Sequence, residues 1–491
     1  MSKKKGAISQ KHPQEAPVRI PRFCAGIFLL YWLLIAAFYV LAGEQLHLRQ
    51  SRGALELPAA ESGTVELCQG AVVEQCFTAE IQRFQSVSVQ WGTYYRPNAG
   101  TVAIELWNLA DGSLLLSQSY DAAAITEGGL TTLTAREPIE GIYGAPLLLK
   151  VYADCQPGSA PSPLMNQSAP AQEGFSLSLN GAPAQGTLCF SASGEDYIWT
   201  GLHYWEFAAG FGAALALALI YIWRRWAAGK HSYVVYALTA LKQYRFLIRQ
   251  LVSRDFRTKY KRSVLGMFWS FLNPLLTMMV QYFVFSTIFR SDIPNYAAYL
   301  LIGIVSFNFF SEACGMALTS IIGNAPLITK VYMPKYIYPL TRVMSSVVNL
   351  GISLIPLVIV CVATGVEFRK SAVLAFYFLA CLMIFSLGLG LLLSSAMVFF
   401  RDTQFLWGVF SMMWMYATPI FYPESILPEE FKFILRINPL YYFLKNIRMC
   451  ILDGLSPEPA IYVQCLLMAF GMLAAGAVVF RGSQDRFVLY L

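Results

Sequence analysis

A dense basic cluster stands directly before an apolar run in the stretch RTKYKRSVLGMFWSFLNPLL, residues 257–276. Four of its first six residues are Lys or Arg, and Trp, Phe, Leu and Met dominate the remainder of the stretch. Cations of this kind bind the anionic headgroups of a cytoplasmic membrane surface, and the apolar run suits the hydrocarbon behind it. The chemistry that this spacing favours is contact with lipid at the point where the chain enters a membrane.

Patterns for covalent or metal chemistry are absent from the sequence. It holds no G-x-x-x-x-G-K-[ST] for ATP phosphates, no H-E-x-x-H and no C-x-x-C, and its four histidines are scattered. We therefore expect no catalytic residue, no metal and no cofactor bound by this chain. Glu312, in FNFFSEACGMAL, is an ionisable residue in an otherwise apolar stretch, which indicates a pore-lining, helix-pairing or interfacial position.

The elements that position these residues are apolar stretches of membrane-spanning length. With 56% hydrophobic and 13% charged residues, the sequence is typical of a polytopic membrane protein. About 20 residues suffice for one helical crossing. The first stretch is longer than the core of a typical signal peptide, which favours a retained anchor. We predict eight spans: Phe23–Gly43, Phe207–Trp223, Ser263–Phe289, Tyr296–Ile322, Val343–Val366, Ser371–Phe400, Thr403–Pro423 and Pro459–Phe480.

The distribution of charge predicts the orientation. Residues 1–22 hold six Lys or Arg and residues 224–262 hold eleven, so both segments are expected in the cytoplasm. Residues 44–204 between them carry sixteen Asp or Glu against six Lys or Arg, as suits an exported domain. We expect a bacterial cytoplasmic-membrane protein with both termini inside. The overall net charge of +7 reflects membrane orientation and does not indicate nucleic-acid binding.

The exported segment has the pattern of an all-β domain. QSVSVQWGTYY, GTVAIELWNL, APLLLKVYAD and GFSLSLNG each alternate with period two between turn residues. ADGS at 110–113 is expected to form a tight turn between two strands. These strands predict an antiparallel sandwich, and their order loosely resembles jelly-roll domains of the carbohydrate-binding kind on bacterial surface proteins.

Two sets of side chains in this domain could carry function. Four aromatic residues could stack on sugar rings, although alternate ones are expected to fill the core. Four cysteines could form two disulfides, with three possible pairings. The glycan-binding candidates are Trp91, Tyr94, Tyr95 and Trp107, and the cysteines are Cys68, Cys76, Cys155 and Cys189.

An amphipathic helix is predicted over 234–256. Its apolar residues recur every three or four positions, and Lys242, Arg245 and Arg249 form a stripe on the opposite face. Such a helix suits the inner-leaflet interface. The basic cluster 257–262 would continue it to about Ser263, where the chain turns into the membrane.

Five segments of the second half resemble one transporter family, in the family's order. YKRSVLGMFWSFLNPLL resembles the entry to the first core helix of type-2 ABC exporter permeases for polysaccharides and polyol phosphates, the family that exports O-antigen, capsule and teichoic acid. NAPLITKVYMPKYIYPL at 324–340 resembles the coupling segment, and FFRD at 399–402 the short inner loop. The segment 418–448 resembles the outer loop, with re-entrant helices around an Asn-Pro pair. Residues 1–230 are an addition to the family's usual length.

The resemblance implies a mechanism and partners. Two copies of the chain would enclose a conduit for a lipid-linked glycan, and two ATPase subunits, which hold ATP and Mg²⁺, would dock on the coupling segment. Aromatic residues facing the conduit would bind sugars weakly. The implied coupling residues are Leu327, Ile328, Lys330, Val331, Pro334 and Lys335. The conduit candidates are Trp269, Tyr282, Phe285, Phe307, Phe310 and Glu312.

The predicted architecture is a polytopic α-helical membrane protein of about eight spans, with an extracytoplasmic all-β sandwich or jelly roll between the first two. The alternatives are a membrane-bound enzyme that modifies glycans and a glycan sensor, each using the sandwich for recognition. The predicted parts are a basic tail (1–22), an anchor (23–43), the sandwich (44–204), a second span (205–223), the interface helix (234–256) and a permease core with six spans (257–491).

Overall fold

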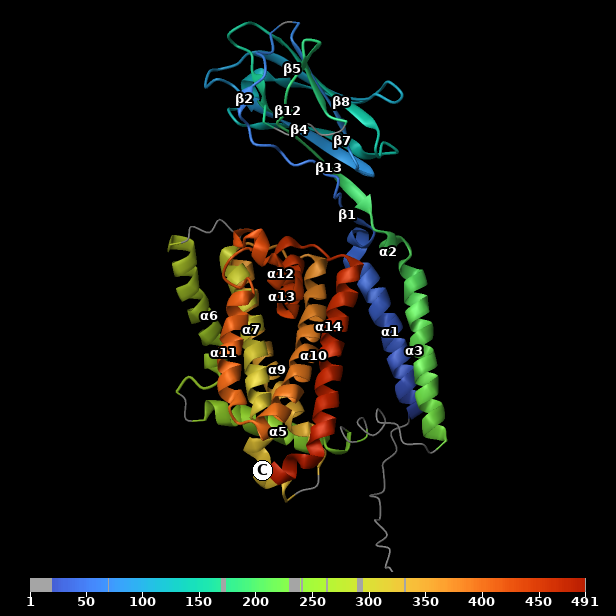
Figure 1. The fold of residues 1–491 in the computed structure, drawn as a ribbon, viewed down its shortest axis with the longest axis vertical. Coiled ribbons are helices and arrows are strands. Elements are labelled where there is room, and N and C mark those ends of the chain that lie inside the picture. The colour runs from blue at the N-terminus through green and yellow to red at the C-terminus, as the bar shows by residue number, and fades with distance from the viewer. Residues whose placement is uncertain are drawn as a thin grey trace, which may run out of the picture. The chain divides into compact units, whose positions relative to one another are not determined.

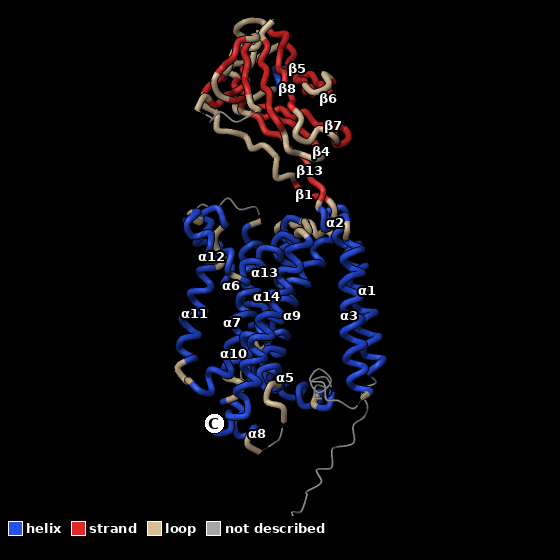
Figure 2. Tube along the Cα trace, turned by 45° about the vertical axis from the view of Figure 1, so that its right-hand side comes forward, coloured by secondary structure: helices blue, strands red, loops and turns tan. Residues whose placement is uncertain are grey.

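The computed structural model divides the chain into two compact units. It describes residues 20–68, 70–168, 174–228, 239, 242–261, 264–288, 295–330 and 333–490. One unit, Leu46–Leu202, is built of strands, and the other combines the segments before and after it and is helical. Figure 2 shows the strands gathered in one unit and the long helices in the other.

The β-unit is a sandwich of two antiparallel sheets (Figure 1). The first has the order β1-β13-β4-β9-β12, with β2 beside β9 and β7 beside β4, and the second has the order β11-β10-β3-β8-β5-β6. The strands are β1 (Leu48–Gln50), β2 (Ser62–Gly63), β3 (Val72–Thr78), β4 (Arg83–Gly92), β5 (Gly100–Asn108), β6 (Ser113–Asp121), β7 (Leu130–Glu140), β8 (Pro146–Cys155), β9 (Ser162–Asn166), β10 (Ser176–Leu179), β11 (Ala182–Ala184), β12 (Thr187–Leu188) and β13 (Phe190–Tyr197).

The core of the β-unit lies between the two sheets. In β8, Leu147, Leu149 and Val151 are fully buried while the residues between them are not, as period two requires. Phe84 and Val89 of β4 meet them from the other sheet. The prediction of an all-β sandwich inserted after the first long helix is confirmed, and its likeness to a jelly roll stays a prediction.

The predicted turn in ADGS is present between β5 and β6. The two strands pair antiparallel from Thr101 with Asp121 to Asn108 with Ser113. Gly112 has a positive φ of 71°, a conformation that favours glycine. The Asp111 carboxylate accepts hydrogen bonds from the Ser113 amide and hydroxyl, which holds the turn closed.

The helical unit contains long apolar helices and several short ones. Seven helical stretches among the described residues are long and apolar enough to cross a membrane: Ile20–Leu46, Tyr204–Ala227, Phe268–Ser286, Tyr296–Leu318, Ile337–Ala363, Lys370–Phe399 and Pro459–Tyr490. Their α-helical parts are α1 (Ile20–Ala42), α3 (Tyr204–Ala227), α6 (Phe268–Phe283), α7 (Tyr296–Leu318), α9 (Ile337–Ala363), α10 (Ala375–Phe399) and α14 (Pro459–Ser483). The shorter helices are α2 (Trp199–Leu202, in the β-unit), α5 (Arg245–Tyr260), α8 (Ala325–Ile328), α11 (Thr403–Ala417), α12 (Lys432–Ile437), α13 (Pro439–Arg448) and α15 (Phe487–Tyr490).

The span predicted over Thr403–Pro423 is shorter than the other seven. Its helix α11 has 15 residues, which at the helical rise gives about 22 Å. The hydrocarbon core of a bilayer is about 30 Å thick, so α11 reaches only part of the way across. Thr418 then takes an extended conformation and begins the loop that leads to α12 and α13.

The interior of the helical unit is built on close approaches between helices. Helix α7 is the most deeply buried of the long helices, and it packs against α9, α10 and α6. A Cβ on Gly476 of α14 would lie 1.9 Å from the carbonyl oxygen of Gly388 in α10. Small residues allow such approaches between membrane helices, where packing supplies the stability.

The first two long helices form a pair that is attached to α14. The Tyr31 hydroxyl of α1 donates to the carbonyl of Ala208 in α3, at 2.7 Å. The Phe38 ring of α1 lies edge-on against Tyr462 of α14, with centroids 4.7 Å apart. Figure 1 shows α1 and α3 side by side. Helix α1 therefore packs against α14, and α3 packs against α1.

Candidate coupling site and conduit

The predicted coupling segment is a short helical knob between α7 and α9. Helix α7 ends at Leu318, a 3-10 turn spans Ile322–Asn324, and α8 follows with Pro326 in its first turn. Proline fits this position because the first amides of a helix need no helical acceptor. The chain then returns through Pro334 into α9.

The coupling candidates divide into buried and exposed residues. Ile328 packs in a cluster with Ile248 of α5 and Phe480 of α14, and Leu327 packs against the same cluster. Lys330 is exposed. The Lys335 ammonium donates to the Gln484 carbonyl and lies 5.8 Å from the Phe487 ring centroid, so it is engaged within the chain. Pro334 is half-buried, and Val331 lies outside the described residues.

An ion pair joins the interface helix α5 to α9, and a hydrogen bond joins α5 to the coupling knob. The buried Asp255 carboxylate lies 3.1 Å from Arg342 of α9 and 3.0 Å from Arg254. Arg254 also donates to the Asn324 side chain at 3.2 Å, directly before α8. A displacement of the knob therefore acts on α5 and α9 together. Helix α5 continues four residues beyond the predicted end at 256, and most of the predicted helix before Arg245 lies outside the described residues.

Glu312 lies in a polar network that connects four helices. Its carboxylate accepts from the Lys259 ammonium of α5 at 2.9 Å and from the Asn349 amide of α9 at 2.6 Å. Asn349 lies 3.4 Å from the Ser270 hydroxyl of α6. An ionisable group in a membrane helix is stabilised by such partners. These contacts favour helix pairing among the roles predicted for Glu312, and its role stays a prediction.

The conduit candidates do not share one surface. Trp269 and Tyr282 of α6 are exposed, 44% and 43%. Phe285 is half-buried and stacks on Phe421, with centroids 5.7 Å apart. Phe307 and Phe310 of α7 do not fit the predicted conduit-facing position, because both side chains are buried within the single chain. Phe310 contacts Phe385, Trp407 and Trp414, and is a packing residue.

The Asn-Pro pair organises a helical hairpin at the end of the unit opposite α8. Asn438 caps α13 by accepting from the Leu440 amide, and it also accepts from the Trp414 indole at 2.7 Å. Its amide donates to Thr418 at 2.8 Å. These bonds satisfy backbone and side-chain groups in the irregular segment after α11, which a membrane environment requires. The predicted break at Asn438-Pro439 between two short helices is confirmed.

Tyr94 and Tyr95 lie together on a strained loop after β4. Both have positive φ, 54° and 56°, a conformation that costs energy for a bulky side chain. Tyr95 is 90% exposed and Tyr94 is 52% exposed. Strain of this kind is retained where the surroundings enforce it, and it clusters at binding sites.

Glu127 and Arg96 hold the tyrosine loop. The Glu127 carboxylate accepts from the Thr93 amide at 2.6 Å and from the Thr93 hydroxyl at 2.8 Å, and these bonds lower the pKa of Glu127. Arg96 lies 4.9 Å from the Tyr94 ring centroid and pairs with Glu66. The loop is therefore fixed by side chains from two directions, while the Tyr95 ring stays open.

The other two glycan candidates are less accessible. Trp91 is fully buried in the β-unit core, so it is a packing residue. This corrects the prediction that it could bind a glycan. Trp107 is half-buried, and its indole donates to Glu105 at 2.8 Å. A sugar can therefore reach Tyr94 and Tyr95 but has no open face at Trp91.

The four cysteines of the β-unit are free thiols in this structure. Cys68 and Cys155 face each other across an isolated parallel β-bridge. Cys189 is fully buried, and burial raises the pKa of its thiol to about 11. The geometry favours the Cys68–Cys155 pairing among the possibilities that the sequence leaves open. No group of three or more potential metal ligands occurs among the described residues.

The structure reveals contacts of charged residues that the sequence patterns did not predict. Asp255, Arg342 and Arg254 sit in basic or apolar stretches, and only their pairing across helices distinguishes them. Arg448 of α13 is buried although it is charged. The sequence feature that could have identified Arg448 is the position of an arginine in an apolar loop on the predicted outer side of the membrane, where Lys and Arg are disfavoured.

Comparisons with known proteins match the helical unit. Residues 247–452 match the ABC-2 type transporter family. An O-antigen export system permease protein RfbA of Klebsiella pneumoniae is 30% identical over 243 residues, 49% of this chain and 93% of the relative. The RfbA of Myxococcus xanthus is 28% identical over 249 residues, 50% and 96%. The polysialic acid transport protein KpsM of Escherichia coli is 21% identical over 246 residues, 48% and 93%.

Proposed function

The chain belongs to the type-2 ABC permeases of polysaccharide export, and from that premise we propose that it moves a lipid-linked polysaccharide or polyol-phosphate polymer across a bacterial cytoplasmic membrane. ATP hydrolysis on a separate subunit would supply the energy. The observation that carries the proposal is the knob around α8, which a hydrogen bond joins to α5, while an ion pair joins α5 to α9. A partner that moves this knob would move transmembrane helices with it.

Two copies of the chain would pair to form the conduit. Trp269 and Tyr282 are exposed in the single chain, as residues that face a conduit between two copies must be. Aromatic rings stack on the apolar faces of sugars without fixing them. Weak contacts suit a polymer that must pass, because tight binding would slow its release.

The charge pattern supports an orientation with α8 in the cytoplasm and the β-unit outside. The β-unit would contact the emerging polymer through Tyr94 and Tyr95, which are exposed and held at a fixed loop. Helices flank it on both sides in the chain, so a weak site there would act at high effective concentration near the exit. The RfbA relatives are named as permeases, which favours this reading over a glycan-modifying enzyme or a sensor.

The decisive experiment is export with an altered knob. The host's own copy is replaced by wild type or by Lys330→Glu, and surface polymer and co-purified ATPase subunit are both measured. Lys330 is exposed, so charge reversal should leave insertion intact while lowering association and export several-fold. Lys370→Glu is the matched control, since Lys370 is exposed and follows α9 at the opposite end. Normal association and export in the Lys330 variant would remove the assignment.

The orientation has its own test. Ala124 is exposed in the β-unit, and an introduced Ala124→Cys should react with a membrane-impermeant maleimide in cells whose cytoplasmic membrane is intact. A cysteine at exposed Lys330 should react only after permeabilisation. The reverse pattern would invert the proposed topology.

A further inference from the structure

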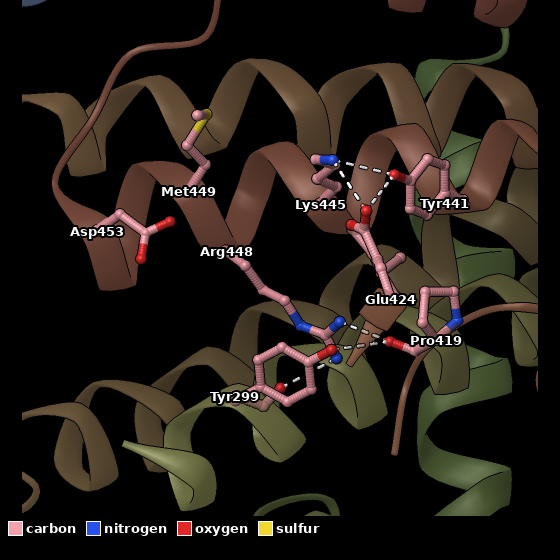
Figure 3. Close-up of a pocket in the computed structure, with 9 residues that line it drawn as sticks. Tyr299, Pro419, Glu424, Tyr441, Lys445, Arg448, Met449 and Asp453 are labelled. Atoms are coloured by element: carbon pink, nitrogen blue, oxygen red, sulfur yellow. Dashed lines mark hydrogen bonds and ion pairs between the residues drawn. The ribbon is translucent and has the colours of Figure 1, made fainter. Parts of the chain in front are cut away.

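Two adjoining hollows lie beside α12 and α13, at the end of the helical unit opposite α8. The first has a volume of about 180 Å³ and is lined by Tyr299, Arg448 and Asp453 among others. The second, of about 330 Å³, is lined by Lys432 and Arg436 among others. Glu424, Tyr441 and Lys445 border both. Figure 3 shows the first hollow, with Tyr299 from α7, Glu424 from the loop before α12, and Tyr441, Lys445 and Arg448 from α13.

Arg448 places a buried positive charge at the wall of the first hollow. It is 7% exposed, and its guanidinium donates to the carbonyls of Pro419, Ile420 and Tyr299 at 2.6, 2.9 and 3.2 Å. Its Cζ atom lies 3.5 Å from the Tyr299 ring centroid. Within the described residues its Nε has no hydrogen-bond partner, and it forms no ion pair with a carboxylate. The charge is therefore oriented by neutral groups and stays uncompensated by a contacting anion.

The chain makes room for this arginine. A Cβ on Gly303 would lie 2.6 Å from an Arg448 nitrogen and 2.9 Å from Ile420. Burying a charge is costly. A glycine that leaves space for the buried Arg448 side chain therefore indicates that the fold specifically accommodates this arginine. A purely structural role, in which Arg448 holds the three carbonyls, does not require an uncompensated charge at the wall of a cavity.

The remaining charges give the hollows a net positive sign. Four cationic side chains, Lys432, Arg436, Lys445 and Arg448, face two carboxylates, Glu424 and Asp453. Lys445 pairs with Glu424 at 3.0 Å, and Tyr441 donates to the same carboxylate. Four minus two leaves a net charge of +2. Lys and Arg are normally depleted on the outer side of a membrane, so their concentration around a hollow there calls for an anionic ligand.

We propose that these hollows bind the phosphate group of a lipid headgroup at the outer face of the membrane. The proposal rests on the proposed function for its orientation. Arginine and lysine are the usual partners of phosphate. The Tyr299 and Tyr441 side chains line the hollow beside it, and their hydroxyl groups donate to neighbouring protein groups. The phosphate would belong either to the lipid that carries the polymer or to bulk anionic phospholipid. In the first case, the site would hold the carrier as it completes its passage.

The test uses the full chain in nanodiscs of phosphatidylcholine, which carries no net charge. Binding of farnesyl pyrophosphate, inorganic pyrophosphate and short-chain phosphatidylglycerol is measured by calorimetry at low and high salt. The test variant is the double change Arg436→Gln and Lys445→Gln, because Arg448→Gln also removes bonds to the backbone. Arg401→Gln is the control, an exposed arginine in the loop between α10 and α11.

The expected result is salt-sensitive binding that the double variant weakens roughly tenfold and the control leaves unchanged. Stronger binding of farnesyl pyrophosphate identifies a carrier-type pyrophosphate lipid, and stronger binding of phosphatidylglycerol identifies bulk lipid. Comparable binding of inorganic pyrophosphate shows that the headgroup suffices. If no probe binds, or if binding ignores the double variant, the inference is wrong. Export that still depends on Lys330 would then leave the proposed function standing.

Discussion

The Lys259 ammonium and the Glu312 carboxylate lie 2.9 Å apart, although 53 residues separate them in the chain. Lys259 stands in the last turn of α5 and Glu312 in the second half of α7. The contact joins α5, the predicted interface helix, to the most buried span of the unit. Because α5 also contacts the coupling knob through the hydrogen bond from Arg254 to Asn324, the Lys259–Glu312 pair is the next contact from the knob toward the interior.

Removing this pair should uncouple the transporter more than it unfolds it. The two side chains are 42% and 27% exposed, so Lys259→Gln should cost about 1 kcal/mol of stability after solvent screening. Polymer export should fall while the ATPase activity of the assembled complex persists. Both activities are measured on membranes from complemented cells. Arg257→Gln, an exposed cation two residues earlier, is the control. Equal loss of both activities would indicate simple misfolding.

Replacing Tyr95 with glycine should separate binding from stability. Glycine adopts positive φ freely, so Tyr95→Gly should stabilise the β-unit by about 1 kcal/mol. The same change removes the most exposed ring of the tyrosine loop and should weaken binding of the host's surface polymer to the full chain. Thermal unfolding and retention on immobilised polymer give the two readouts.

The control for this prediction is Tyr143→Ala, which removes another exposed tyrosine of the β-unit. Polymer retention should be unchanged in it. If Tyr95→Gly binds polymer as well as wild type does, the tyrosine loop is not a glycan site.

The hydrogen bonds that the Glu127 carboxylate accepts from Thr93 should weaken at acidic pH. Hydrogen bonds from Thr93 lower the pKa of Glu127 below its ordinary value of 4.5. A carboxyl group with a lowered pKa stabilises the folded state fully above its unfolded pKa, and this contribution is lost as pH falls through the folded pKa. Protection of the Thr93 amide from hydrogen exchange, corrected for intrinsic rates, should therefore hold above about pH 5 and decline below about pH 4. In Glu127→Gln the protection should be weaker and show no such step.

Cys68 and Cys155 should form a disulfide when the protein is made in its host. Residues paired across a parallel bridge have Cα atoms about 4.8 Å apart, within the range that a disulfide spans. The proposed exterior is an oxidising compartment. Peptide mapping without reduction should recover the linked peptides, and Cys68→Ser should release the Cys155 thiol for alkylation. Recovery of both thiols free in the native protein would refute the pairing.

Local signals in the sequence predicted several elements well. The alternation in β8 and the Asp111-Gly112 turn each follow from two or three neighbouring residues. Asn438-Pro439 likewise breaks and caps a helix by its own chemistry. In such cases the residues that determine the local structure are close in the sequence, so the sequence pattern is enough to predict it.

Pairings between distant segments could not be predicted in this way. Phe310 looks like a conduit residue because an apolar helix has no polar face to mark its orientation, yet its partners come from α10 and α11. Asp255 sits among cations, and its choice of Arg342 depends on how α5 lies against α9. Arg448 finds its acceptors in the loop after α11. The sequence shows the charged residues, but their partners can be identified only in the folded structure.

The close approach of Gly388 and Gly476 has a consequence for how the protein is made. Helix α10 is synthesised well before α14, and its glycine surface has no complementary partner until α14 has left the ribosome and entered the bilayer. Until then, the packing surface around Gly388 is exposed to lipid and to neighbouring chains. Completion of the permease is thus a late event in biosynthesis, and a bulky residue at either glycine should strand an inserted but unassembled protein for quality-control proteolysis.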